Sequence, residues 1–167
     1  LPSLTLEQLD LLVDQAECNR DKAIISLFAD SGLRLSELAS VKRSNIDWQH
    51  KLIRVICKGN KEGYAPFGSK TETLLREWIA EYPATNTIWD ISEWGITWML
   101  RKLRAKTGLP CNAHTFRRTF ACLLRKQGLD ILTIKDLGRW ESLEMVQRYT
   151  RSVTFLDSLK FYKAPLS

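Results

Sequence analysis

The sequence AHTFRRTF, residues 113 to 120, places His114 and Arg117 three residues apart at the start of an expected helix. Free backbone N–H groups and the positive end of the helix dipole favour an anion at such a position. Phe116 and Phe120 have the apolar spacing that would anchor this helix in the core and turn His114 and Arg117 outward. The pair is therefore either a surface patch beside a core stripe or a site that holds an anion.

Four further residues could take part in chemistry, and each also has a structural explanation. Arg34 stands before an expected helix and could pair with Glu37 or face a ligand. Lys58 lies where an expected strand meets a turn, and basic side chains in such turns are usually solvated. Trp140 and Tyr149 lie near helix ends, where aromatic side chains usually complete the core. Taken one at a time, the structural explanation is the simpler one for all four.

Apolar spacing, capping residues and turn signals predict the elements that would position these residues. The β-branched run at residues 53–56 and a second run at 64–67 predict a hairpin around the long basic turn KGNKEG, and residues 46–48 could add a third strand. The fold class is therefore α+β, mostly helical with a small antiparallel β-sheet. Helices are predicted at residues 6–16, 21–31, 36–41, 69–81, 92–107, 114–128, 131–137 and 142–150, with a weak helical turn in the tail.

Capping signals fix several of the expected helix starts. Thr5 with Gln8 and Ser69 with Glu72 each have the spacing of a capping box, in which the two residues hydrogen-bond each other's backbone N–H groups. Ser142 is expected to cap the helix that carries Tyr149.

The charge balance favours a polyanionic partner. Lys and Arg number 25 against 19 Asp and Glu, a formal net charge of +6. The chain has no apolar run long enough for a membrane span, and its first residues, LPSLTLEQLD, do not resemble a signal peptide.

The cysteines argue against a metal site. Cys18, Cys57, Cys111 and Cys122 form no CxxC pair, and His50 is the only histidine outside the HTFRR motif. We therefore expect free or buried thiols in a reducing compartment, the cytoplasm, and no metal or other cofactor.

Five short motifs together resemble the tyrosine recombinases, the phage-integrase-type enzymes: SGLRLSEL, CKGNK, HTFRR, LGRW and QRYTR. That family has an ordered set of residues: Arg, Lys, His-x-x-Arg, His or Trp, and Tyr. Glu37 stands at the acidic position usual beside the first arginine. The resemblance spans residues 34 to 149 and assigns the catalytic set, in order, to Arg34, Lys58, His114, Arg117, Trp140 and Tyr149.

The resemblance implies a site-specific recombinase or integrase that cuts and rejoins double-stranded DNA through a 3′-phosphotyrosine on Tyr149. Arg34 and Arg117 would clamp the phosphate, because a guanidinium donates two parallel bonds to phosphate oxygens. Lys58 would protonate the leaving 5′-oxygen, and His114 would donate to a phosphate oxygen or accept the tyrosine proton. Trp140 would support the phosphate or pack against the nucleophile helix.

The same resemblance implies that residues 1–167 form one catalytic domain, with the family's N-terminal DNA-clamping domain outside this chain. The full-length protein would act as a tetramer on DNA, with residues 150–167 passed to a neighbouring copy. Two alternatives stay open: a type IB topoisomerase-like activity that nicks and rejoins DNA, and a non-catalytic DNA-binding module of the same fold.

One position departs from the family pattern. The residue before the Trp position is normally glycine, whereas here it is Arg139, with Gly138 one step earlier. We expect either a changed turn or an added phosphate contact. The basic residues that could contact DNA phosphates are Lys42, Arg43, Lys61, Arg118, Lys126 and Arg139.

Overall fold

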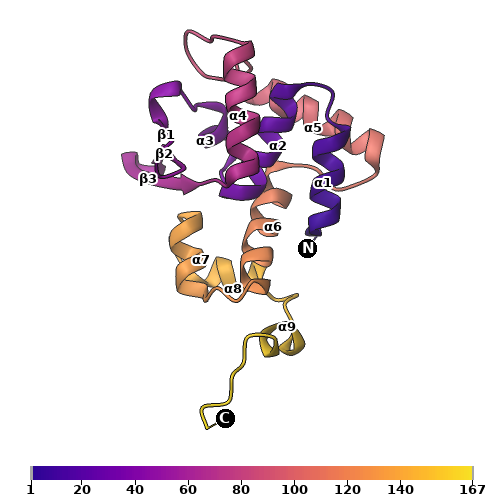
Figure 1. The fold of residues 1–167 in the computed structure, drawn as a ribbon, viewed down its shortest axis with the longest axis vertical. Coiled ribbons are helices and arrows are strands. Elements are labelled where there is room, and N and C mark those ends of the chain that lie inside the picture. The colour runs from indigo at the N-terminus through magenta and orange to yellow at the C-terminus, as the bar shows by residue number, and fades with distance from the viewer. Residues whose placement is uncertain (1, 167) are drawn as a thin grey trace.

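The computed structural model of the chain describes residues 2–166, apart from the side chain of Lys58. Its helices and small antiparallel sheet confirm the predicted α+β class (Figure 1). Within residues 2–166, no helix is both long and apolar enough to cross a membrane. The α-helices are α1 (Leu6–Gln15), α2 (Asn19–Ser31), α3 (Leu35–Ala39), α4 (Ser69–Glu81), α5 (Glu93–Thr107), α6 (Ala113–Lys126), α7 (Ile131–Gly138), α8 (Leu143–Tyr149) and α9 (Phe155–Leu159).

The sheet lies on one flank of the helical body and has the strand order β1-β2-β3, with antiparallel neighbours (Figure 1). Its strands are β1 (Ile46–Asp47), β2 (Leu52–Cys57) and β3 (Lys61–Pro66). The side chains of Ile53 and Val55 point into the core, as the alternation of a half-buried strand requires.

The hairpin turn is shorter than predicted. Cys57 pairs with Lys61, so the turn is only the 3-10 segment η2 (Lys58–Asn60). Gly59 and Asn60 both have positive φ, 78° and 59°, which closes the turn tightly.

The main core surrounds α2, which contacts α1, α4 and α6. Ile24, Ile25, Leu27 and Phe28 are fully buried, which confirms the predicted buried side of this helix. Phe28 stacks on Phe116 of α6 with ring centroids 5.4 Å apart. The N-terminal end of α6 is therefore fixed in the main core. We call the part of the molecule built around this core, α1 to α6 with the sheet, the body.

A second apolar cluster lies farther along α6. It consists of Phe120, Ala121, Ile134, Trp140 and Val146, with Tyr149 packed against it. Figure 1 shows α6 running from the body to α7 and α8, with α9 and the tail projecting beyond them. Because α6 contributes to both clusters, it joins the body to the segment that carries Tyr149.

The two predicted capping boxes have different outcomes. The first is confirmed: the Thr5 hydroxyl accepts the Gln8 N–H at 3.1 Å, and the Gln8 side chain accepts the Thr5 N–H at 2.9 Å. The second is wrong, because the N-cap of α4 is Gly68 and Ser69 already lies in the helix. Ser142 does occupy the N-cap position of α8 but makes no side-chain capping bond.

A residue from another helix holds the start of α4 instead. The Asp30 carboxylate accepts the Gly68 N–H at 2.8 Å and the Thr71 hydroxyl at 2.6 Å. The Ser69 hydroxyl is bound by the Lys51 ammonium at 2.7 Å. This tertiary contact satisfies the helix start and leaves the local capping box unused.

Candidate active site

Arg34 stands at the N-cap of α3, directly after the turn that ends α2. Gly32 makes that turn in the left-handed conformation, with φ 64° and ψ 17°. The Glu37 carboxylate accepts the Arg34 backbone N–H at 2.8 Å and lies 3.4 Å from its Nη1. The Glu37 side chain is only 5% exposed, whereas that of Arg34 is 41% exposed. Arg34 is therefore fixed at its backbone while its guanidinium still reaches the surface.

Arg117 points inward, and the prediction that it faces outward is wrong. The residue is 6% exposed. Its Nη1 donates to the Gly32 carbonyl at 2.6 Å, and its guanidinium lies 4.1 Å from the centre of the Trp140 ring. Burial, followed by the charges of Arg34 and Arg139, lowers the pKa of Arg117 to about 9. The reason is packing: α6 is covered on this face as well as on the Phe116 face.

The second amino nitrogen of Arg117, Nη2, is buried and has no hydrogen-bond partner among the described residues. A charged donor without a partner is costly in a protein interior. An anion that reached this nitrogen would remove that cost.

Trp140 and Tyr149 lie beside Arg117 as an aromatic pair. Their ring centroids are 6.0 Å apart in an edge-on arrangement. Trp140 packs over Gly138 so closely that a Cβ there would come within 1.8 Å of the indole. The glycine therefore permits the indole to reach Arg117 and to lie against the tyrosine.

Arg139 adopts the left-handed conformation, with φ 58° and ψ 36°, and ends α7. Glycine adopts this conformation without strain, so the turn keeps a glycine-like backbone although the residue is arginine. The side chain is 6% exposed and lies 3.7 Å from Glu37. The Arg139 side chain thus makes an internal contact with Glu37, and the expectations of a changed turn or an added phosphate contact stay predictions.

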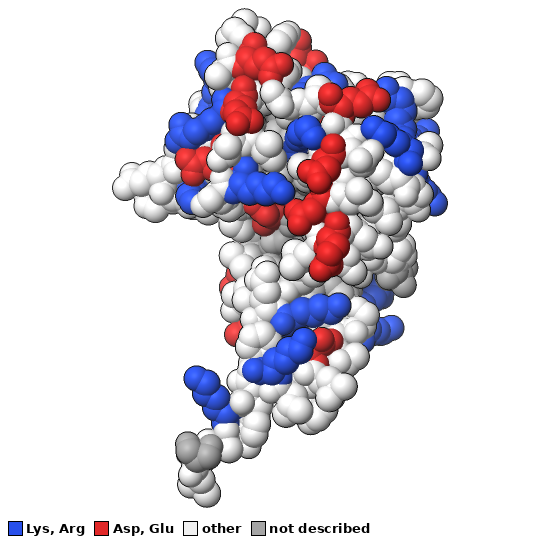
Figure 2. Space-filling model, turned by 45° about the vertical axis from the view of Figure 1, so that its right-hand side comes forward, with Lys and Arg blue, Asp and Glu red and all other residues white. Residues whose placement is uncertain are grey.

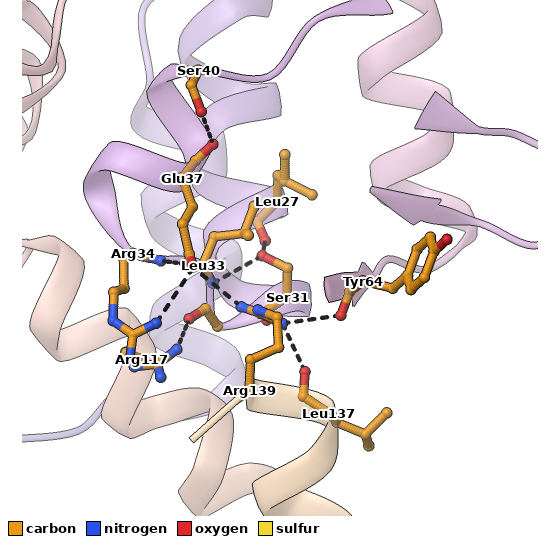
Figure 3. Close-up of polar contacts among 11 residues, drawn as sticks. Leu27, Ser31, Leu33, Arg34, Glu37, Ser40, Tyr64, Arg117, Leu137 and Arg139 are labelled. Atoms are coloured by element: carbon orange, nitrogen blue, oxygen red, sulfur yellow. Dashed lines mark hydrogen bonds and ion pairs between the residues drawn. The ribbon is translucent and has the colours of Figure 1, made fainter. Parts of the chain in front are cut away.

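Figure 3 shows that Arg34, Arg117 and Arg139 gather around Glu37. Three guanidinium groups face one carboxylate, so the cluster carries an excess of positive charge. Trp140 extends this arginine cluster through its ring contact with Arg117, and Tyr149 extends it through its ring contact with Trp140. Four predicted site residues are thus brought together: Arg34, Arg117, Trp140 and Tyr149.

The other two predicted site residues, His114 and Lys58, have no described side-chain contact with the cluster. His114 is exposed in the first turn of α6, one turn before Arg117, and no described residue hydrogen-bonds its ring. Lys58 begins η2 at the end of β2, but its side chain lies outside the described part of the structure. Their predicted contacts with a phosphate stay predictions.

A hollow of about 220 Å³ lies between α3, α5 and the start of α6. It borders on both helix starts, because Leu35 follows Arg34 and Ala113 precedes His114. Arg101 and Arg104 of α5 line its other side. These two arginines make the α5 side of the hollow positively charged.

The remaining basic candidates differ in exposure. Lys42, Arg43, Lys61 and Lys126 are exposed. Arg118 is partly buried and donates to the Pro2 carbonyl at 3.1 Å, so it ties down the N-terminal segment. On the face shown in Figure 2, basic and acidic side chains are mixed, so that face has no uniform positive patch.

The cysteine, histidine and acidic side chains of the described residues form no cluster of metal ligands. All four cysteines are free, with Cys111 and Cys122 buried. Within residues 2–166, no group of three or more His, Cys, Asp and Glu side chains could hold a metal ion.

Two structural roles were not predicted from the sequence. They are the contact of Glu37 with Arg139 and the close packing of the Trp140 indole over Gly138. The sequence did contain a signal for the tight turn at residues 138–139. A helix end was predicted at residue 137, and a left-handed residue commonly follows a helix end.

Comparison with known proteins gives consistent results. A sequence model of the phage integrase family matches residues 2–154. Tyrosine recombinase XerA of Saccharolobus solfataricus is 32% identical over 154 residues, which is 92% of this chain and 52% of that protein. Tyrosine recombinase XerC of Staphylococcus saprophyticus is 29% identical over 162 residues, which is 86% of this chain and 55% of that protein. The chain thus spans about half the length of these curated relatives.

Solved structures share the fold. A crystal structure of XerA recombinase superposes with a TM-score of 0.82 at 23% identity, covering 97% of this chain and 64% of that one. The Tn1549 transposon integrase in complex with circular intermediate DNA gives 0.76 at 17% identity, covering 95% of this chain and 63% of that one.

Proposed function

The chain belongs to the phage integrase family, the tyrosine recombinases, and we propose that it carries the DNA-cleaving domain of a site-specific recombinase. One observation carries the proposal. Arg117 is anchored to Gly32 yet keeps a buried nitrogen without a partner, beside Arg34 and the Trp140–Tyr149 pair. A DNA phosphodiester is an anion of the size and charge that would satisfy this nitrogen.

Binding of the phosphate is the first step. Arg34 and Arg117 donate to its non-bridging oxygens, since a guanidinium matches two such oxygens at once. The bound anion favours the charged form of Arg117 and so raises the pKa that burial has lowered. The same cations stabilise the extra negative charge of the transition state, which is the main contribution a protein makes to phosphoryl transfer.

Cleavage then forms one bond to phosphorus and breaks another. The phenolic oxygen of Tyr149 attacks, its proton passes to His114, and the bond to the 5′-oxygen breaks. Lys58 gives a proton to that leaving oxygen. The roles of His114 and Lys58 rest on the family resemblance, and that of Tyr149 also on its contact with Trp140.

The 3′-phosphotyrosine keeps the energy of the broken bond. A 5′-hydroxyl from a second DNA strand can therefore reverse the reaction and join the strands in a new pairing. No nucleotide cofactor or metal ion takes part in this sequence of steps.

The same proposal covers the extent of the domain and its partners. Residues 1–167 form one catalytic domain that acts on double-stranded DNA in the cytoplasm. XerH and the Tn1549 integrase, both similar in fold, have been solved bound to DNA. In the hollow between α3, α5 and the start of α6, Arg101 and Arg104 would add positive charge for DNA phosphates.

The C-terminal segment supports a tetramer on DNA. Phe155 and Leu156 of α9 are 77% and 69% exposed, and Phe161 and Tyr162 follow with half or more of their surface open to solvent. Such an exposed apolar segment fits a contact with a neighbouring copy of the chain.

Covalent trapping tests the proposal. The chain is incubated at low salt with a library of nicked duplexes in which the short cut strand diffuses away after cleavage, and denaturing gels detect adducts. We expect adducts with the wild-type chain and none with Tyr149→Phe. Tyr82→Phe, which alters an exposed tyrosine bound to Asp90 away from the arginine cluster, should leave adduct formation unchanged.

Adducts that survive Tyr149→Phe would refute the assigned nucleophile. Transfer of the bound strand to a second duplex distinguishes recombination from simple resealing, because a topoisomerase-like enzyme restores only the original strand.

A further inference from the structure

Arg139 is a buried charge at the junction between the body and the segment that carries the nucleophile. It directly precedes Trp140 of the second apolar cluster and contacts Ser31 of α2 in the body. Neither the proposed chemistry nor the family resemblance assigns it a role, because the family normally has glycine at this position.

The guanidinium of Arg139 connects four elements (Figure 3). It donates to the Leu137 carbonyl of α7 at 2.8 Å, the Ser31 carbonyl of α2 at 3.3 Å and the Tyr64 carbonyl of β3 at 3.4 Å. Its Nη2 lies 3.7 Å from Glu37 of α3. These contacts join the end of α7, just before Trp140, to the strand after the Lys58 turn and to the helix that Arg34 begins.

Glu37 is shared between two arginines. Its Oε2 lies 3.4 Å from Arg34 Nη1, and its Oε1 lies 3.7 Å from Arg139 Nη2. The carboxylate is almost fully buried, and a buried charge needs a countercharge. Arg139 provides a buried countercharge that solvent does not screen, which leaves the more exposed Arg34 free to meet a phosphate.

Without Arg139, the balance around Glu37 changes. Arg34 would be the nearest cation left to neutralise the carboxylate, and its guanidinium would be drawn inward, away from the phosphate. The end of α7 would also lose its polar attachment to α2 and β3, which sets where Trp140 and Tyr149 lie relative to Arg117.

We propose that Arg139 is a positioning residue for DNA cleavage. It neutralises Glu37 so that Arg34 can serve the phosphate, and it fixes the Tyr149 segment against the body. This inference rests on the proposed function, since it concerns the rate of Tyr149 attack.

The test separates the rate of cleavage from the affinity for DNA. The main variant is Arg139→Met, which keeps a side chain of similar length on the same left-handed backbone and removes the charge. Adduct formation at saturating DNA gives the first-order rate, and noncovalent binding is measured in a Tyr149→Phe background. Arg76→Met is the control, because Arg76 also pairs with a carboxylate, Glu72 at 2.9 Å, but lies on α4.

We expect the rate to fall by about 100-fold in Arg139→Met, since a misplacement of about 1 Å can cost that much. The dissociation constant should change by less than about 3-fold, because one internal arginine adds little to the total phosphate attraction. Arg139→Lys should recover part of the rate by restoring the charge. The control variant should match the wild type in both measurements.

A compensating substitution provides a second test, in which no buried carboxylate is left without a countercharge to destabilise the fold. Adding Glu37→Gln to Arg139→Met removes the unpaired buried carboxylate, so it should raise the rate above that of Arg139→Met alone. Thermal unfolding establishes that each variant is folded at the assay temperature.

Several results would overturn the inference. These are a wild-type rate in Arg139→Met, equal losses of rate and affinity, or a double variant slower than Arg139→Met. Absence of any Tyr149 adduct with the wild-type chain would instead refute the proposed function, so the two failures are distinguishable.

Discussion

A glycine can provide two things at a turn: space where a Cβ would lie, and a left-handed backbone without strain. Here the first is found at Gly138 and the second at Arg139. Gly138 leaves room for the Trp140 indole, and Arg139 adopts the left-handed backbone conformation. A left-handed non-glycine residue costs about 1 kcal/mol. The carbonyl contacts of Arg139 offset that cost, which explains how an arginine can replace the usual glycine here.

The close approach of the indole leads to a prediction. Gly138→Ala places a methyl group within the Trp140 ring, so the indole must move and its contacts with Arg117 and Tyr149 are lost. We expect a loss of about 1–3 kcal/mol in the free energy of unfolding, measured with urea, and slower adduct formation. Ser142→Ala is the control, since Ser142 makes no capping bond. Equal stability of the two variants would contradict this packing.

The buried thiol of Cys111 predicts a pH dependence. Burial raises the pKa of Cys111 from 9.0 to about 12, so above pH 9 the unfolded chain loses this proton while the folded chain keeps it. The free energy of unfolding should then decrease with rising pH, by about 1 kcal/mol at pH 10. Cys111→Ala should lack this decrease, and urea unfolding of both proteins at pH 8 and pH 10 measures the difference. Parallel pH profiles would rule out the effect.

Among helices and strands, α6 was predicted well in extent but not in its surroundings. The spacing of Phe116 and Phe120 gave its buried side correctly. That spacing could not show that α7 and α8 return to cover a second side, and so it placed Arg117 outward. Likewise, the spacing of Ser69 and Glu72 fits a capping box. In the structure, however, the carboxylate of Asp30 in α2 accepts the Gly68 N–H at the start of this helix. Local patterns therefore predicted the elements, and tertiary contacts decided which way the site residues face.

The start of α4 tests that distinction. Asp30→Ala removes the acceptor for the Gly68 N–H and the Thr71 hydroxyl and should cost about 1 kcal/mol of stability, as loss of a helix cap does. Ser69→Ala removes only an exposed contact with Lys51 and should cost much less. Urea unfolding measures the loss in the free energy of unfolding for each variant. A larger loss for Ser69→Ala than for Asp30→Ala would show that Ser69, and not Asp30, caps α4.

In the molecule as a whole, the candidate site lies where α1 to α6 and the sheet meet the segment formed by α7 and α8. The body supplies Arg34, α6 supplies Arg117, and the second cluster supplies Trp140 and Tyr149. The ordered motifs predicted this set of residues, because the resemblance depends on their order along the chain. The arginine cluster around Glu37 could not be predicted that way, because it depends on how distant turns meet.

The exposed apolar tail leads to a prediction about assembly. Phe155→Asp should lower the oligomeric state on DNA, because it puts a charge into the apolar contact that we propose between copies. Leu6→Asp is the control, since Leu6 is also exposed but lies at the start of α1. Analytical ultracentrifugation with and without DNA measures both variants. An unchanged assembly in Phe155→Asp would exclude α9 from the contact.

Mass spectrometry of the covalent adduct identifies the residue that attacks DNA. After digestion of the protein and the DNA, the peptide that contains Tyr149 should carry a nucleotide on its phenolic oxygen. Attachment at any other side chain, or a Tyr149 peptide recovered unmodified from purified adduct, would contradict the arrangement of Arg34, Arg117, Trp140 and Tyr149 as a DNA-cleaving site.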